Sequence, residues 1–367
     1  MRDYHATWMG IVALSQLGAI TRVVMQQIAK ADEQNESSVL WANFVGTLLL
    51  GFANTCKPQM DRAGITPLFY AVTAGFCGAL TSFSTWMFEV VRWAVAWPQP
   101  VVINDGLSVL RMHNRALSVA SGLLVDLGVA YMGYEMGRVC GQPYANQKEQ
   151  DAEAAPLVGK ARPNLRTQQT VLVRTMTDCN YMHGNQELDP PPSVRRRLLA
   201  GVVENIVVMQ LAAFALCSTA VTLGAAGGAA FGRTSEAMLF TVLFAPLGSL
   251  LRYWLGIRLN AWPEHFRLGT FIANFVACGI AVATVVAQAH GDCFKAHPWT
   301  EGALKGVISG FCGALSTMST FVAQLHEMDR VHAPMYAILS CGAALLMMCL
   351  ALWTYLFFSG WPAQVCV

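Results

Sequence analysis

The chain has 367 residues, of which 54% are hydrophobic and only 13% are charged. Soluble proteins have about 25% charged residues, so this composition argues against a water-soluble enzyme and indicates a membrane protein. The net charge of +2 lacks the basic excess that phosphate binding needs, so no nucleic-acid partner is expected. The 11 cysteines form no CxxC pair and are interpreted as small apolar residues.

Nine apolar runs approach the roughly 20 residues that cross a hydrocarbon core. They lie at residues 9–29, 39–56, 66–91, 116–137, 198–223, 237–257, 268–289, 303–325 and 334–358. Because a backbone in lipid must satisfy its own hydrogen bonds, each run is expected to be a helix. The polar stretch 140–197 is proline-rich and predicts an aqueous connection. The predicted fold is an all-α integral membrane protein with nine transmembrane helices.

The two halves of the chain repeat one another. Residues 75–89 (GFCGALTSFSTWMFE) and 310–324 (GFCGALSTMSTFVAQ) agree at eight of fifteen positions, and ANFV occurs at 42–45 and again at 273–276. This predicts two four-helix units, a first unit at residues 9–139 and a second unit at residues 236–358. The run at 198–223 adds one linker helix between them, so the second unit is expected to be inverted relative to the first.

Lysine and arginine predict the orientation, because cytoplasmic loops carry an excess of them. The loops on the N-terminal side hold the larger share, including the flanking residues Arg138, Arg195, Arg196 and Arg197. The N-terminus and the 140–197 connection are therefore expected in the cytoplasm, and the C-terminus outside the cell.

Polar residues inside the apolar runs are candidates for function, because placing them in lipid is costly. Arg22 and Arg252 are interpreted either as snorkelling anchors or as positive charges at two vestibules of an anion path. Asn43 and Asn274 either hold helices together or donate their amide N–H groups to an anion. Asp126 is interpreted as the one carboxylate deep in an apolar run, with a proton relay, a packing role and a lesion in a nonconducting pore as alternatives.

Four hydroxyl residues follow each glycine-rich segment, namely Thr81, Ser82, Ser84 and Thr85 in the first unit and Ser316, Thr317, Ser319 and Thr320 in the second. Helix packing alone explains the glycines, but so many hydroxyls in lipid need partners. A helix broken at mid-membrane would free carbonyls for a cation and offer hydroxyl and aromatic-edge donors to an anion. Nothing in the sequence indicates catalysis, and no enzymatic activity is expected.

The twin GFCGAL segments, with an asparagine and an arginine upstream of each, resemble the fluoride channels of the Fluc and FEX type, also called CrcB-like proteins. The two fused units with a linker helix are similar to the eukaryotic members. The resemblance implies passive, selective export of F⁻ from the cytosol across the plasma membrane, by a single chain among membrane lipids. A proton-coupled anion transporter on an inverted-repeat scaffold and a non-transporting membrane scaffold protein remain the alternatives.

The same resemblance implies which residues contact the anion. They are the asparagines Asn43 and Asn274, the ring positions Phe83, Trp86, Met318 and Phe321, the fourth-helix residues Ser118, Tyr336 and Ser340, and Thr320. It also implies a structural Na⁺ on the backbone carbonyls of Gly78, Thr81, Gly313 and Ser316. Because an ionised Asp126 would oppose an anion in the first unit, we expect conduction along the path of Asn274, Tyr336 and Ser340.

Overall fold

The computed structural model describes residues 2–31, 37–95, 108–153, 232–261, 265–290 and 298–359, and the regular elements in these ranges are all helical. Within them, seven helical stretches are long and apolar enough to cross a membrane. These are Tyr4–Ala29, Thr66–Val95, Ala116–Ala145, Ala237–Leu259, Leu268–Ala289, Trp299–Glu327 and His332–Phe358. The predicted class, an all-α protein that crosses the membrane several times, is confirmed at this level. The expected linker helix at 198–223 lies outside the described residues.

The first unit begins with two long helices and continues through a broken one. Its elements are α1 (Arg2–Ala31), α2 (Leu40–Arg62), α3 (Thr66–Tyr70), the π-helical segment η1 (Ala71–Cys77), α4 (Gly78–Leu80), α5 (Phe83–Val95) and α6 (Ser108–Glu153). Helix α2 is more polar than the seven stretches above and is not among them. Helix α6 continues past residue 139, so the expected start of the polar connection at residue 140 lies inside a helix.

The second unit has the same order of elements. They are α9 (Gly232–Leu259), α10 (Leu268–His290), α12 (Pro298–Gly306), the π-helical segment η3 (Val307–Cys312), α13 (Gly313–Leu315), α14 (Met318–Glu327) and α15 (His332–Ser359). Each GFCGAL segment therefore runs from a π-helical turn into one short α-helical turn.

Both third helices break at the same point of the repeated sequence. The backbone becomes extended at Thr81 (ψ 148°) and at Ser316 (ψ 152°), directly after the GFCGAL segments. Helices α5 and α14 then begin anew at Phe83 and Met318. The predicted mid-helix break is confirmed in both units, and it leaves carbonyl and N–H groups without their usual helical partners.

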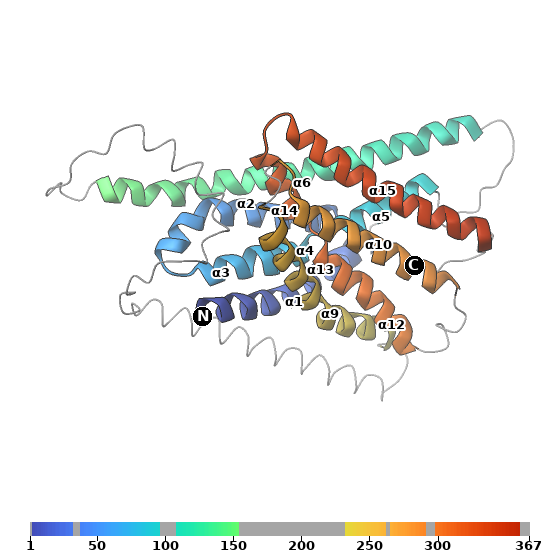
Figure 1. Ribbon diagram of the computed structural model, residues 1–367, viewed down its shortest axis with the longest axis horizontal. Helices are drawn as coiled ribbons and strands as arrows, with labels where there is room; N and C mark the ends of the chain where they lie inside the picture. Colours follow the sequence, from blue (N-terminus) through green and yellow to red (C-terminus); the bar gives the residue numbers. More distant parts are fainter. Residues whose placement is uncertain are drawn as a thin grey trace.

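Helices α1 and α9 cross beneath the two breaks, as Figure 1 shows. Gly18 allows α1 to approach η1, and Gly248 allows α9 to approach η3, because a Cβ on either glycine would collide with the carbonyl oxygen of Phe76 or Phe311 respectively. Four small side chains are buried where these elements meet, Ala19, Ala79, Ala245 and Ala314. Small residues at such crossings allow backbone contact, which is how helices associate tightly in membranes.

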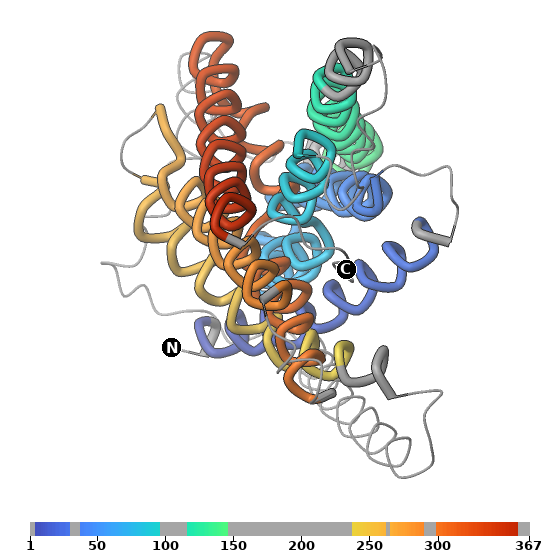
Figure 2. The backbone as a smooth tube through the Cα atoms, turned by 90° about the vertical axis from the view of Figure 1, so that its right-hand side faces the viewer, coloured from blue at the N-terminus to red at the C-terminus, as the bar shows by residue number. Residues whose placement is uncertain are grey.

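The two fourth helices, α6 and α15, stand apart with α5 between them (Figure 2), and α5 contacts both. Helix α6 packs closely along α2, because Cβ atoms at Gly51, Gly133 and Gly137 would collide with backbone carbonyls of the facing helix. On the other side, the Gly279 position of α10 faces the flexible Met347 side chain of α15 at 3.4 Å. Helix α6 thus contacts α2 through backbone atoms, whereas α15 meets α10 at Gly279 through a side chain.

Candidate functional site: a buried track of amides, rings and hydroxyls

Arg22 and Arg252 lie inside the protein, where each holds the broken helix region of the other unit. The Arg22 guanidinium donates to the carbonyls of Ala79 (2.5 Å), Gly313 (2.7 Å) and Ser309, and Arg252 donates to the carbonyl of Ala74. Their exposed fractions are 1% and 6%. Both guanidinium groups are buried against backbone carbonyls rather than extended to an exposed surface, and the vestibule role stays a prediction. The carbonyls they contact come from segments distant in the sequence.

Asn43 and Asn274 each bind the first residues after the break of their own unit. Asn43 Oδ1 accepts a hydrogen bond from the Ser82 N–H (3.0 Å), and Asn274 Oδ1 accepts one from the Thr317 N–H (2.8 Å). Asn274 Nδ2 makes a long contact of 3.4 Å with the Thr317 carbonyl. Asn43 Nδ2 is buried and has no hydrogen-bond partner within the part of the chain that the structure describes. The oxygen of each amide orders the break, which leaves the NH₂ group as the part suited to an anion.

The hydroxyls at the two breaks are exchanged between the units. Thr81 Oγ1 accepts from the Ser319 N–H (3.1 Å), and Ser316 Oγ accepts from the Ser84 N–H (3.1 Å). Ser84 and Ser316 also contact each other through their hydroxyls at 2.8 Å. Each unit thus supplies the hydrogen bond that begins the other unit's continuing helix, and these hydroxyls find the partners that burial demands.

The breaks also provide carbonyl oxygens of the kind that a Na⁺ ion takes. The Ser82 N–H donates to Asn43 instead of to the Gly78 carbonyl, which lies four residues earlier. In the same way, the Thr317 N–H donates to Asn274 instead of to the Gly313 carbonyl. The short helices α4 and α13 that carry Gly78 and Gly313 pack against each other. The Gly313 oxygen accepts from Arg22, but a carbonyl has a second lone pair. These carbonyls are donors that the implied ion could use, and the guanidinium groups of Arg22 and Arg252 lie beside the same two glycines.

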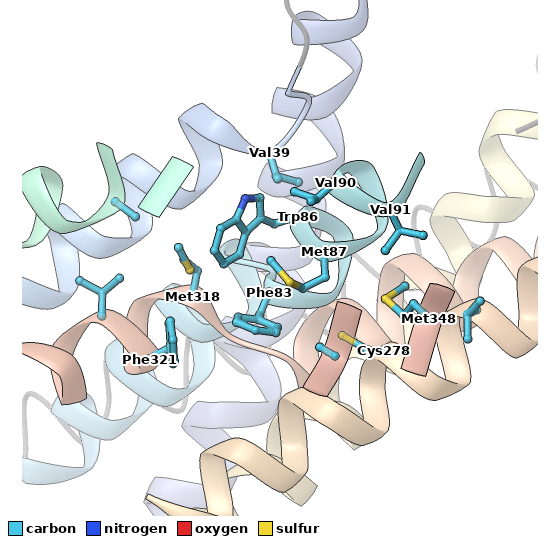
Figure 3. Close-up of a cluster of buried hydrophobic side chains, with 14 of the residues drawn as sticks. Val39, Phe83, Trp86, Met87, Val90, Val91, Cys278, Met318, Phe321 and Met348 are labelled. Carbon is cyan, nitrogen blue, oxygen red and sulfur yellow. The ribbon is translucent and has the colours of Figure 1, made fainter. Parts of the chain in front are cut away.

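Five buried or half-buried rings form a continuous contact chain through the middle of the protein. Their centroids are separated by 5.5 Å (Trp86 to Phe83), 5.3 Å (Phe83 to Phe321), 5.4 Å (Phe321 to Tyr336) and 5.0 Å (Tyr336 to Phe266). Figure 3 shows Phe83, Trp86, Met318 and Phe321 converging from the two units. Three of these four pairs are edge-to-face and the Phe321–Tyr336 pair is tilted. The edges of aromatic rings are positively polarised and attract anions. The structure thus brings the expected ring positions together.

Trp86 belongs to the side of this chain that faces α6. Its indole N–H donates to the Gly122 carbonyl at 3.1 Å, and the Trp93 ring fills the space where a Gly122 Cβ would lie. Met318 is fully buried and occupies in the second unit the position that the aromatic Phe83 occupies in the first. Large side chains and a direct contact with α6 therefore occupy the first-unit side of the ring chain.

The same side holds two buried carboxyl groups, those of Glu89 and Asp126. Together with the two serines that contact them, Ser37 and Ser38, we call these residues the carboxyl cluster. Ser37 Oγ lies 3.1 Å from Glu89 Oε2 and 3.0 Å from Asp126 Oδ2, and both N–H and hydroxyl of Ser38 donate to Glu89 Oε1. Glu89 is 9% exposed and Asp126 2%. The interpretation of Asp126 as the one deep carboxylate was wrong. Glu89 is a second buried carboxyl residue, and its place within the apolar run 66–91 could have predicted this from the sequence.

Neutral groups take the corresponding place in the second unit, and we call them the amide–phenol chain: Gln324, Thr270 and Tyr336. Gln324 Nε2 donates to Thr270 Oγ1 (2.8 Å), and the Tyr336 hydroxyl contacts Gln324 Oε1 (3.2 Å). The same hydroxyl lies 3.4 Å from the Arg267 carbonyl. Ser340, one turn beyond Tyr336 on α15, is 3% exposed and continues its buried face. These donors are neutral, so they can bind an anion without a competing negative charge.

The remaining expected residues lie at the margins of this arrangement. The Thr320 N–H donates to Thr317 Oγ1 (3.3 Å), so this residue helps to begin α14. Ser118 is half-buried on α6, and its carbonyl accepts a hydrogen bond from Ser121 at 3.0 Å. The centre offers amide, hydroxyl and ring-edge donors that are buried inside the protein. Such a set suits a small, strongly hydrated anion that must exchange water for protein donors.

Comparison with known proteins agrees with this geometry. The chain matches the family described as CrcB-like protein, Camphor Resistance (CrcB), over residues 9–129 and 239–353. It is 26% identical to fluoride export protein 1 of Candida albicans, covering 94% of this chain and 80% of that protein. It is 24% identical to fluoride export protein 2 of Saccharomyces cerevisiae, covering 90% and 87%.

A bacterial relative matches a shorter stretch. The fluoride-specific ion channel FluC of Pseudomonas paraeruginosa is 41% identical over 93 residues, which are 24% of this chain and 67% of that protein. No solved structure matches the chain. The two regions that match the family are the two units that carry the breaks, the asparagines and the ring chain, and the chain therefore belongs to the CrcB-like protein family.

Proposed function

We propose that the chain is a passive, fluoride-selective channel that exports F⁻ from the cytosol across the plasma membrane. The match to fluoride export proteins over nearly the whole chain carries this proposal. The buried donors support it, because F⁻ is small and strongly hydrated and is held well only by closely placed N–H, O–H and ring-edge groups. The names of the relatives describe export proteins and ion channels, and we assign the chain no enzymatic activity.

Passive conduction is sufficient for export. The weak acid HF crosses membranes in neutral form and dissociates in a less acidic cytosol, so fluoride accumulates inside. A negative membrane potential then drives the anion out, at about 2.3 kcal/mol per charge for each 100 mV.

We further propose that the second unit lines the conducting path. Its amide–phenol chain, with Ser340 and Asn274, offers neutral donors next to the rings of Phe321 and Phe83. The carboxyl cluster and Trp86 occupy the other side, where an ionised carboxylate would repel F⁻. Phe83 then serves the path from the opposite unit.

The arrangement in the membrane is proposed as nine helices, with the second unit inverted relative to the first by the helix at 198–223. The reciprocal contacts of Arg22 and Arg252 and the exchanged hydroxyls support a two-fold relation between the units. The N-terminus and the 140–197 connection are then cytoplasmic and the C-terminus extracellular. One chain contains both units, so we propose that it works alone among membrane lipids.

A structural Na⁺ between the breaks is also proposed. The carbonyls of Gly78, Thr81, Gly313 and Ser316 would hold it, and oxygen donors of this kind suit a hard cation. Coordination by carbonyls from both breaks would join the two broken helices. The residues of the chain itself would still bind and orient the anion.

One observation favours a proton-coupled transporter as the second candidate. Glu89 and Asp126 contact the same hydroxyl in a buried place, as a proton relay requires. A scaffold without transport has no comparable observation in its favour among the described residues.

Reconstitution separates these candidates. Purified protein in liposomes loaded with fluoride should release it rapidly when the charge is balanced by a potassium ionophore, and an imposed proton gradient should not change the rate. Release that requires or follows the proton gradient would establish the coupled transporter, and no release would leave the scaffold. In cells, deletion should cause fluoride hypersensitivity that is greatest in acidic medium, with chloride tolerance unchanged.

A further inference from the structure

Two loops at one end of the second unit bring together two imidazoles and a carboxylate. His265 lies just before α10, Asp329 lies in the loop between α14 and α15, and His332 is the first residue of α15. One ligand atom from each of these residues lies within 4.8 Å of the other two. Asp329 and His265 are exposed and His332 is half-exposed, so the group is open to solutes from water.

The carboxylate of this group is held in place before any ligand arrives. Asp329 Oδ1 accepts hydrogen bonds from the backbone N–H groups of His332 (2.8 Å) and Val331 (3.0 Å). Preorganised ligands of this kind bind metals more tightly, because less ordering is required on binding.

The two imidazoles also converge. The rings of His265 and His332 stack at a centroid distance of 4.3 Å with an interplanar angle of 11°. His332 Nδ1 lies 2.7 and 2.8 Å from the two oxygens of Asp329. A metal ion replaces the shared proton when it enters such a contact. Two neutral imidazoles and one carboxylate, with water in the fourth position, are a common ligand set for zinc.

We propose that His265, Asp329 and His332 form a binding site for a divalent transition-metal ion of the zinc class. Ligand atoms around tetrahedral zinc are about 3.5 Å apart. Side-chain rotations that move the ligand atoms of this group by roughly 1 Å would bring them to that separation. The bound ion joins the loop before α10 to the loop before α15. The inference does not depend on which ion, if any, the protein conducts.

The position of the site gives the bound ion a structural consequence. Phe266 follows His265 directly and packs edge-on against Tyr336, while Tyr336 lies one turn after His332. The Arg267–Glu327 ion pair of 3.6 Å joins the same two loops. A metal ion bound to His265 and His332 therefore restrains Phe266 and Tyr336, the last pair of the ring chain, and should raise the unfolding temperature.

Metal binding to the full-length protein tests the proposal. Chelator-stripped protein in detergent is titrated with Zn²⁺ in a calorimeter, and with Co²⁺ in a spectrophotometer. Tetrahedral Co²⁺ on nitrogen and oxygen gives visible d–d bands without the sulfur charge-transfer band of a cysteine site. We expect one Zn²⁺ per chain, visible Co²⁺ bands and a higher unfolding temperature with Zn²⁺.

Three variants identify the ligands. His265→Ala and His332→Ala should each weaken Zn²⁺ binding at least tenfold and remove the Co²⁺ bands, whereas His5→Ala, at an exposed position of α1, should change neither. Within the described ranges the His265 side chain makes no hydrogen bond, unlike His332, so replacing it should disturb folding less. His265→Ala therefore remains informative if His332→Ala misfolds. Unchanged affinity in His265→Ala, or a sulfur band, would overturn the proposal. Fluoride release by metal-free protein is measured separately, so failure of either proposal is recognised independently.

Discussion

Glu89 and Gln324 occupy the same final position of the twin segments 75–89 and 310–324, and both are buried beside a fourth helix. Glu89 shares the Ser37 hydroxyl with Asp126 of α6, while Gln324 joins Thr270 to Tyr336 of α15. The Ser37 hydroxyl has one proton, so it donates to only one of these two carboxyls at a time. The repeated sequence has thus diverged from a neutral amide track on one side to a carboxyl pair on the other.

This relationship predicts the effect of exchanging the two residues. Gln324→Glu should reduce fluoride release at least about a hundredfold, since a carboxylate 4 Å from the anion costs about 4 kcal/mol at an effective dielectric of 20. Glu89→Gln should leave release within about a factor of two. The measurement is efflux from liposomes with equal amounts of folded protein. A large loss in Glu89→Gln with normal release in Gln324→Glu would assign conduction to the first unit.

The two asparagines allow a matched comparison. Asn274→Ala should abolish fluoride release, and Asn43→Ala should reduce it only mildly, because the carboxyl cluster and Trp86 already oppose an anion on the Asn43 side. Each change also leaves one buried N–H without its acceptor, at Thr317 or Ser82, which costs about 1–3 kcal/mol. Since this structural cost is shared, each variant controls for the other. Equal loss from the two would mean that both sides conduct or that the asparagines act through folding.

The arginines are predicted to matter for stability. Arg22→Ala and Arg252→Ala should lower the unfolding temperature of the purified protein, because charge-assisted hydrogen bonds to buried carbonyls contribute about 1.5–3 kcal/mol each. Arg22→Lys should rescue this only in part, since an ammonium group cannot match the planar guanidinium fork. Exposed Arg62 provides the control, and Arg62→Ala should unfold like the parent. Normal unfolding with impaired fluoride release would instead support the vestibule role.

The inverted arrangement predicts opposite sides for two segments. An epitope tag within the 140–197 connection should be accessible only after the plasma membrane is permeabilised, and a tag after Val367 should be accessible on intact cells. Antibody labelling of both tagged proteins, checked for normal fluoride resistance, measures this directly. Detection of both tags under the same condition would exclude an odd number of spans between them.

The sequence determined the helical membrane class and the places where two helices break, and it predicted the two units and the residues at the centre. Apolar runs of about 20 residues must be helical in lipid, and the twin GFCGAL segments with their hydroxyls predicted breaks that lie at Thr81 and Ser316. Asn43, Asn274 and the ring positions were found because polar or aromatic groups repeated at matching places in an apolar chain are few and costly. These features depend on local composition and spacing.

Only the tertiary structure decided what these residues contact. Arg22 meets the Gly313 carbonyl and Glu89 meets Ser37, and neither pairing follows from a pattern along the chain, because the partners come from separate helices. The exchange of hydroxyls between Thr81, Ser319, Ser84 and Ser316 likewise requires the two breaks to pack against each other. Periodicity indicates which face of a helix is buried, but helix packing selects the partner, and in this protein that selection separates a neutral track from a carboxyl pair.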